Sequence, residues 1–87
     1  MKPVARKGDL HRCPIPGHGT TEIITGSPSK IEGQPVARVG DKTGCCATII
    51  EGSSHSSHDG RPIAYLGCKT DHGGEIITAS SSAKVEP

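Results

Sequence analysis

Apolar residues in this chain come in short runs of at most four, in segments punctuated by Gly, Pro, Asp or Ser. Short runs of this kind, rich in Ile, Val and Thr, are typical of β-strands. Because 12 Gly and 7 Pro fall every few residues along the 87-residue chain, the pattern leaves no window for a helical stripe. We therefore predict an all-β protein with six short strands, at residues 4–7, 22–25, 36–39, 48–51, 63–66 and 75–78.

One tract occurs three times. Residues 35–41 nearly copy residues 3–9, and residues 62–68 are a more diverged third copy. After each copy come a loop with Cys or His, a second strand with an Ile-Ile pair, and a turn dipeptide: Glu32-Gly33, Asp59-Gly60 and, in a worn form, Glu86-Pro87. Such repetition indicates one supersecondary unit used three times. We predict a single domain over residues 1–87, with repeats at about 3–34, 35–61 and 62–87. Three hairpins around a pseudo-threefold axis would bring the three loops together at one pole.

The composition limits what can hold this fold together. Hydrophobic residues make up 31% of the chain, and its one aromatic residue is Tyr65. An average globular domain is about 45–50% apolar. A small aliphatic core usually needs a disulfide, a metal ion or a partner to stabilise it. The N-terminus has no hydrophobic signal segment, so we expect a protein made in the cytoplasm, with its four Cys as thiols.

Charge and motifs argue against several classes of function. Ten Lys and Arg balance nine Asp and Glu without a basic block, so we expect no nucleic-acid partner. No apolar run is long enough to cross a bilayer, so we expect no stable membrane insertion. The chain has neither a Gly-x-Ser-x-Gly motif nor a phosphate-binding loop, and we expect that it is not an enzyme.

The loops that follow the repeated Gly-Asp positions carry candidate metal ligands. Equivalent offsets place three of them around one axis: Cys13, Cys45 and His72, each four residues after the aspartate position of its repeat. His11 or His18 would complete a tetrahedral set of nitrogen and sulfur ligands of the kind that zinc prefers. We predict one structural zinc ion, held by four of these five residues.

The other polar residues have simpler interpretations. We expect His55 and His58 to be solvated at the turn end, and Cys46 and Cys68 to be packing or spare thiols. The repeated aspartates suit turn or backbone-capping roles better than roles around a metal. The repeated arginines, Arg6 and Arg38, suit a solvated face or a salt bridge to a neighbouring repeat.

The repeated tracts resemble the PAAR repeat (Pro-Ala-Ala-Arg), here with Val in the second place. Residues 13–19 (CPIPGHG), 26–28 (GSP) and 72–74 (HGG) are similar to the same family. The resemblance covers nearly the whole chain, from Pro3 to Ser80. It implies a short, sharp, all-β cone whose broad base docks on the blunt end of the trimeric VgrG spike of the bacterial type VI secretion system. It further implies a zinc ion near the apex, held in family members typically by three His and one Cys. The tip would cap and sharpen the spike for membrane puncture and would help to carry effectors.

Carried onto this sequence, the resemblance implies that His18 and His72 are ligands and that Cys13 or Cys45 is the thiolate. A three-His site would need His11 as well. We expect one chain per VgrG trimer, and separate effector proteins because no toxin domain follows the third repeat. We expect the protein in the bacterial cytoplasm before firing and in the target cell afterwards.

Two other functions compete with the spike tip. A small zinc-binding adaptor would recruit partner proteins through its turn-end loops and would bind a partner that is not a spike. A thiol enzyme or redox protein would use Cys45 and Cys46, and would need an exposed thiolate with a lowered pKa.

Overall fold

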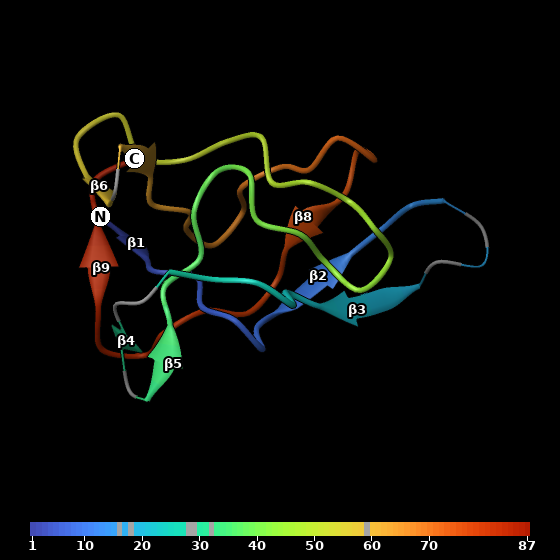
Figure 1. Cartoon of the computed structure of the whole chain (residues 1–87), viewed down its shortest axis with the longest axis horizontal. Helices are drawn as coiled ribbons and strands as arrows, with labels where there is room; N and C mark the ends of the chain where they lie inside the picture. Colours follow the sequence, from blue (N-terminus) through green and yellow to red (C-terminus); the bar gives the residue numbers. More distant parts are fainter. Residues whose placement is uncertain (16, 18, 28–29, 32, 59) are drawn as a thin grey trace.

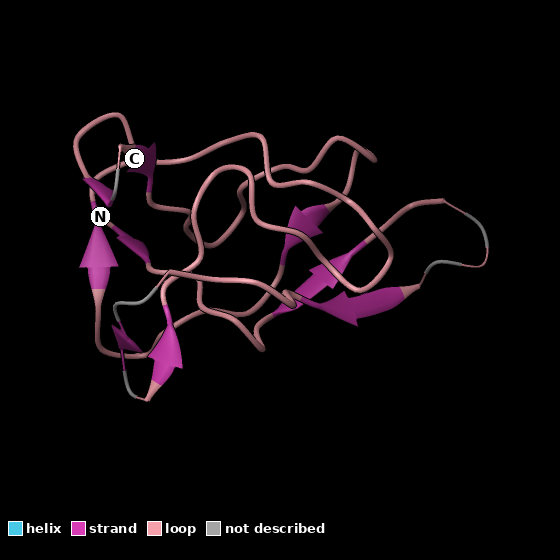
Figure 2. Cartoon of the chain, viewed as in Figure 1, coloured by secondary structure: helices cyan, strands magenta, loops and turns pink. Residues whose placement is uncertain are grey.

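The computed structural model describes residues 1–15, 17, 19–27, 30–31, 33–58 and 60–87, and measures 33 × 24 × 21 Å. The strands in this part of the chain are all short (Figures 1 and 2): β1 (Lys2–Pro3), β2 (Leu10–Arg12), β3 (Thr20–Glu22), β4 (Lys30–Ile31), β5 (Gln34–Pro35), β6 (Ser57–His58), β7 (Arg61–Pro62), β8 (Glu75–Ile76) and β9 (Lys84–Val85). The described residues contain no helix, which confirms the all-β prediction. No described helix is therefore long and apolar enough to span a membrane.

A ring of backbone hydrogen bonds at the centre relates the three repeats. The N–H of Ala5 donates to the carbonyl of Ala64 at 3.0 Å, Ala37 to Ala5 at 3.0 Å, and Ala64 to Ala37 at 2.9 Å. Each repeat thus donates to one neighbour and accepts from the other, as a pseudo-threefold axis requires. All three alanines have 0% exposure. Their small side chains allow the three segments to pack closely around the axis.

This ring explains why the predicted strands are mostly single bridges rather than ladders. A ladder forms when successive residues of one strand bond to the same partner strand. Near the axis, alternate residues bond to different repeats: Val4 bridges to Tyr65, whereas Arg6 bridges to Val36. The tract predicted as a strand at residues 4–7 is therefore extended and paired, but regular strands lie beside it, at β1 and β2.

Three antiparallel strand pairs make up one end of the molecule, called here the hairpin end: the hairpins β4–β5 and β6–β7, and the pair β1–β9. Gly33 and Gly60 have φ of +81° and +78°, so they supply the left-handed backbone that tight turns need. Their predicted turn partners Glu32 and Asp59 lie outside the described residues. In the third pair, which no turn connects, the first and last strands lie side by side, with Lys2 opposite Val85.

The core is built in layers along the axis. Next to the alanines lies a layer of three isoleucines with at most 1% exposure, one from each repeat: Ile23, Ile49 and Ile76. The next residue of each pair points outward and is 37–54% exposed: Ile24, Ile50 and Ile77. Alternation of this kind is the strand period. Burying each inner isoleucine contributes about 1.5–3 kcal/mol. A second cluster, with Val4, Val36 and Val85 at its centre, fills the hairpin end.

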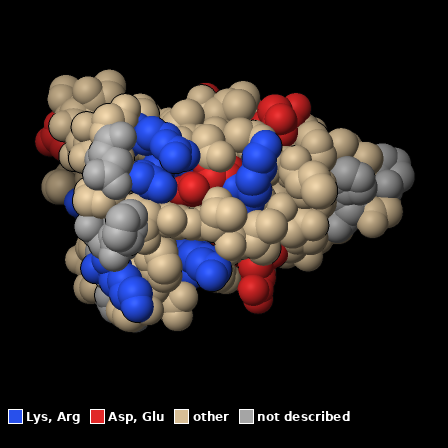
Figure 3. Space-filling view, viewed as in Figure 1, with Lys and Arg blue, Asp and Glu red and all other residues tan. Residues whose placement is uncertain are grey.

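The opposite end of the long axis is called here the loop end, and it is built on the three-stranded sheet β3-β2-β8. Figure 1 shows the hairpins gathered at the left and this sheet at the right. The space-filling view narrows from the hairpin end toward the loop end (Figure 3). The described part of the molecule therefore tapers toward the end where the predicted ligand loops lie.

Candidate metal centre

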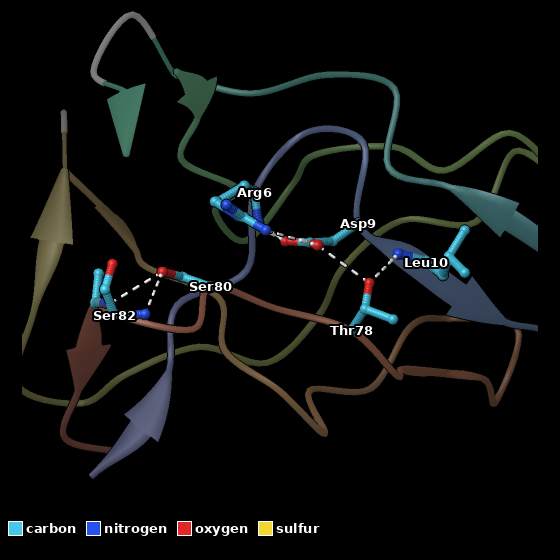
Figure 4. Close-up of polar contacts among 7 residues, drawn as sticks. Arg6, Asp9, Leu10, Thr78, Ser80 and Ser82 are labelled. Carbon is cyan, nitrogen blue, oxygen red and sulfur yellow. Dashed lines mark hydrogen bonds and ion pairs between the residues drawn. The ribbon is translucent and has the colours of Figure 1, made fainter. Parts of the chain in front are cut away.

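Each ligand loop leaves the core through a turn that begins at the repeated arginine position. In the first repeat, the backbone N–H of Arg6 donates a hydrogen bond to Asp9 Oδ2 at 2.8 Å. The Arg6 side chain forms an ion pair with the same oxygen, with Nε at 3.1 Å. The hydroxyl of Thr78 donates to Asp9 Oδ1 at 3.1 Å, so this turn is also tied to another repeat (Figure 4). The aspartate therefore caps a turn, as predicted. The ion pair between Arg6 and Asp9 lies within one repeat.

The second and third loops have the same backbone. Thr43 N–H donates to the Ala47 carbonyl at 2.9 Å, and Thr70 N–H donates to the Gly74 carbonyl at 3.0 Å. The first loop is longer and closes between β2 and β3, where Cys13 N–H donates to the Gly19 carbonyl at 3.0 Å. The enlarged first loop is six residues longer than the other two, and the segment from its isoleucine pair to the next proline is one residue shorter, which together give the five extra residues between the first two leading prolines.

The three residues at equivalent offsets converge at the loop end. The ligand atoms of Cys13, Cys45 and His72 all lie within 4.8 Å of one another. His72 Nδ1 is 3.7 Å from Cys13 Sγ and 3.9 Å from Cys45 Sγ. Tetrahedral zinc, with bonds of about 2.0–2.3 Å, would place its ligand atoms roughly 3.6 Å apart. Small movements would therefore bring the three atoms onto one ion.

His11 lies beside this group rather than in it. Its Nδ1 is 3.9 Å from Cys45 Sγ, and its Nε2 is 2.8 Å from Thr70 Oγ1. Sequence reasoning missed Thr70 and its equivalent Thr43. Both lie two residues after the aspartate position, as His11 does, and that offset could have shown that the three form one layer. All three are buried, at 0–2% exposure. The remaining candidate, His18, lies outside the described residues.

The environment of Cys45 favours a thiolate. Burial alone would raise its pKa, but hydrogen bonds from Thr43, the Ala47 backbone and His72 outweigh burial and lower the pKa from 9.0 to about 5. The closest of these partners is the Thr43 hydroxyl, 3.3 Å from the sulfur. A metal-binding cysteine must be deprotonated, so this environment prepares Cys45 as a ligand.

An open cavity of about 260 Å³ borders the group on the Cys13 side. Its walls come from the two segments that flank the centre: Arg12, Cys13, Pro14, Gly73, Gly74 and Glu75. The Arg12 guanidinium lies 3.8 Å from the Glu75 carboxylate along this wall. The cavity gives an ion in solvent a short path to the Cys13 sulfur.

The other cysteines and histidines lie elsewhere. Cys68 is fully buried in the core cluster with the inner isoleucines, and burial raises the pKa of its thiol. Cys46 is exposed and has φ of +68°, a conformation that Gly73 provides at the equivalent place in the third repeat. His58 lies in β6 at the hairpin end, with His55 in the segment just before it. Both histidines thus lie at the hairpin end, as predicted; His55 is exposed, whereas His58 is half-buried.

Two thiols and an imidazole are soft to borderline ligands, and such sets suit zinc-like ions better than magnesium or calcium. The donor chemistry of Cys13, Cys45 and His72 therefore fits a metal ion. Together, the fold and this group define a small pseudo-threefold β-protein with a candidate metal centre at its narrow end.

The comparison with protein families identifies the class further. The PAAR motif model matches residues 1–51 and again residues 30–78, and the two matches overlap. Together they cover the chain from residue 1 to residue 78, so the chain belongs to the PAAR motif family. Membership supports a role in the tip of the type VI secretion spike, where proteins of this family are structural components rather than enzymes. No curated protein matches the chain.

Proposed function

We propose that this chain is the tip of a type VI secretion spike and sits on the blunt end of a trimeric VgrG protein, one chain per trimer. The observation that carries the proposal is the ring of hydrogen bonds through Ala5, Ala37 and Ala64. Because of this ring, one chain presents three similar faces around one axis. A pseudo-threefold monomer can therefore match a true threefold partner without a second copy.

The hairpin end is the docking end in this proposal. Its three strand pairs, β1–β9, β4–β5 and β6–β7, are separate two-stranded sheets. Their edge strands therefore offer backbone N–H and C=O groups to a partner built of strands. The loop end then points away from the spike. Its taper suits puncture of a membrane, and separate effector proteins would travel with the spike from the bacterial cytoplasm into the target cell.

We propose zinc as the ion and a structural role for it. Cys13, Cys45 and His72 supply three ligands, and His18 or His11 supplies the fourth. When bound, the ion would cross-link three repeats at the end that bears the load. A small aliphatic core gains much from such a link, since structural zinc contributes about 10 kcal/mol or more in small zinc peptides.

A binding experiment with matched variants tests the docking. The chain is mixed with a trimeric VgrG spike, and the mass of the complex is measured by light scattering after gel filtration. We expect one chain per three spike chains. Gln34→Arg, in β5 at the hairpin end, should weaken binding, whereas Thr20→Arg, in β3 at the loop end, should not. Both residues are exposed, so neither change disturbs the core. The absence of a complex, or weakening by Thr20→Arg alone, would contradict the proposal.

A further inference from the structure

His11 is a completely buried histidine whose ring connects the candidate metal centre to the core. It lies in β2, has 0% exposure, and contacts Thr70 Oγ1 through Nε2 at 2.8 Å and Cys45 Sγ through Nδ1 at 3.9 Å. A neutral imidazole has one donor nitrogen and one acceptor nitrogen. The role of one contact therefore determines the role of the other.

The two tautomers give His11 different functions. With the proton on Nε2, the ring donates to the Thr70 hydroxyl, and the lone pair on Nδ1 is free to bind a metal ion. With the proton on Nδ1, the ring donates to the Cys45 sulfur and accepts from the Thr70 hydroxyl. In the first case His11 is a ligand, and in the second it orients a ligand.

Geometry favours the second tautomer. The group of mutually close ligand atoms among the described residues consists of Cys13, Cys45 and His72, and His11 is not in it. His11 also lies two residues after the aspartate position, in the layer that threonines occupy in the other repeats, and not in the layer of the ligand group.

The ring is also held in place from the side. A Cβ added at Gly74 would collide with His11 Nε2 and with the carbonyl oxygen of Arg12. This contact leaves no free space between the ring and the backbone of the third loop. The Nε2 edge of His11 therefore lies against the third loop and Thr70, while its Nδ1 edge faces Cys45.

We propose that His11 is a positioning residue, which accepts the Thr70 hydroxyl proton at Nε2 and donates Nδ1–H to the Cys45 thiolate. The proposal rests on the metal centre of the preceding section. It assigns the fourth ligand position to a group other than His11. The hydrogen bond would fix the direction of the Cys45 sulfur and connect the first, second and third repeats through side chains.

Nuclear magnetic resonance of the ¹⁵N-labelled chain tests the tautomer directly. Two-bond ¹H–¹⁵N correlations show which ring nitrogen carries the proton, with and without one equivalent of zinc. We expect the His11 proton on Nδ1 in both samples. A proton on Nε2 would overturn the proposal, and an Nδ1 that carries no proton and shows the ¹⁵N shift of a zinc-bound nitrogen would make His11 a ligand. If wild-type chain binds no zinc, the metal centre fails, but the tautomer is still read from the metal-free sample.

Zinc affinity, measured by competition with a chromophoric chelator, tests the consequence. His11→Thr installs the residue that the other two repeats have, and should keep one zinc per chain while weakening affinity about 10–100-fold, as loss of an outer hydrogen-bond partner does. His11→Asn, which keeps an N–H donor near the place of Nδ1, should recover most of this loss. His55→Thr, the same change at an exposed histidine, should leave affinity unchanged.

Other results would contradict the positioning role. If His11→Thr abolished stoichiometric binding, as His72→Ala should, His11 would be a ligand. If its affinity equalled that of the wild type, the hydrogen bond would have no role. Thr70→Val removes the hydroxyl, and should weaken affinity without adding to the effect of His11→Thr. All variants are prepared with zinc present, so that folding without metal does not limit the comparison.

Discussion

The backbone N–H of Lys69 donates to Glu51 Oε1 at 3.0 Å, in a place where the other repeats use a threonine hydroxyl. Thr25 accepts the N–H of Lys42 at 3.0 Å, and Thr78 accepts the N–H of Leu10 at 2.7 Å. The third turn has also lost its aspartate, because Cys68 Sγ accepts the N–H of Tyr65 there at 3.3 Å. The third turn thus has no carboxylate of its own, and the nearby carboxylate is that of Glu51 in the second repeat.

This exchange predicts coupling between Glu51 and Cys68. Cys68→Asp should destabilise the protein by about 1–3 kcal/mol, because the new buried carboxylate would face that of Glu51. Adding Glu51→Thr should recover part of the loss, since it recreates the Asp41–Thr25 hydrogen bond seen at 2.9 Å in the second turn. Urea unfolding of the two single variants and the double variant measures the coupling, which we expect at about 0.5–3 kcal/mol. Additive effects would show that the third turn is not a rearranged copy of the others.

The alanine ring should tolerate no enlargement. Ala37→Val adds two methyl groups at a site with 0% exposure, and should cost about 1–3 kcal/mol through overpacking. For a domain of this size that corresponds to a fall in Tm of roughly 4–8 °C per kcal/mol. Ala79→Val, at a half-buried site near the hairpin end, is the matched control and should change Tm little. Equal shifts for the two variants would mean that the ring is not closely packed.

The repeat offsets predicted the convergence of Cys13, Cys45 and His72, because equivalent positions in a threefold arrangement occupy equivalent places. They did not place His11, since the difference between an offset of two and an offset of four becomes a difference of layers only once the backbone is known. The predicted strand tracts form β-bridges or short strands, but those at residues 4–7, 36–39 and 63–66 each end in a turn residue. The pairing partners of these tracts were not predicted. A residue such as Ala5 bonds to two different repeats, and the local sequence does not indicate which repeat each backbone group pairs with.

Gly74 should be needed because the Arg12 carbonyl and the His11 ring both lie against it. Gly74→Ala would place a methyl group against the His11 ring and the Arg12 carbonyl, so it should lower both Tm and zinc affinity. The equivalent residue in the second repeat is Ala47, fully buried, so an alanine fits this turn when no histidine lies against it. Gly74→Ala should therefore be somewhat less harmful in the His11→Thr background, which removes one of the two clashes and leaves the one with the Arg12 carbonyl. Thermal melting of the four proteins checks this, and equal losses in both backgrounds would contradict it.

Cys45 should react as a thiolate in mildly acidic solution when metal is absent. With its pKa lowered to about 5, the metal-free chain should be alkylated at Cys45 at pH 6, where an ordinary thiol hardly reacts. Cys68, buried and with a raised pKa, should not react. Mass spectrometry of the labelled peptides distinguishes the two sites. Bound zinc should protect Cys45, whereas a thiol enzyme would keep a reactive thiolate in its metal-loaded form.

The same lowered pKa sets a pH dependence of stability for the metal-free chain. The folded state holds the Cys45 thiolate at pH values where the unfolded chain holds the thiol, so the unfolded state binds more protons between pH 5 and pH 9. The stabilisation from this group is complete above the unfolded pKa and is lost as the pH falls through about 5. Cys45→Ser should remove this dependence, which chemical unfolding across the pH range would measure.

The central claim is that an ion at the loop end stabilises a pseudo-threefold β-protein with a very small core. The most direct test is the metal content of the purified chain by mass spectrometry, with thermal melting before and after a strong chelator. We expect one zinc per chain, and a fall in Tm of about 20 °C or more once the metal is removed. A chain without metal, whose melting the chelator leaves unchanged, would contradict the account.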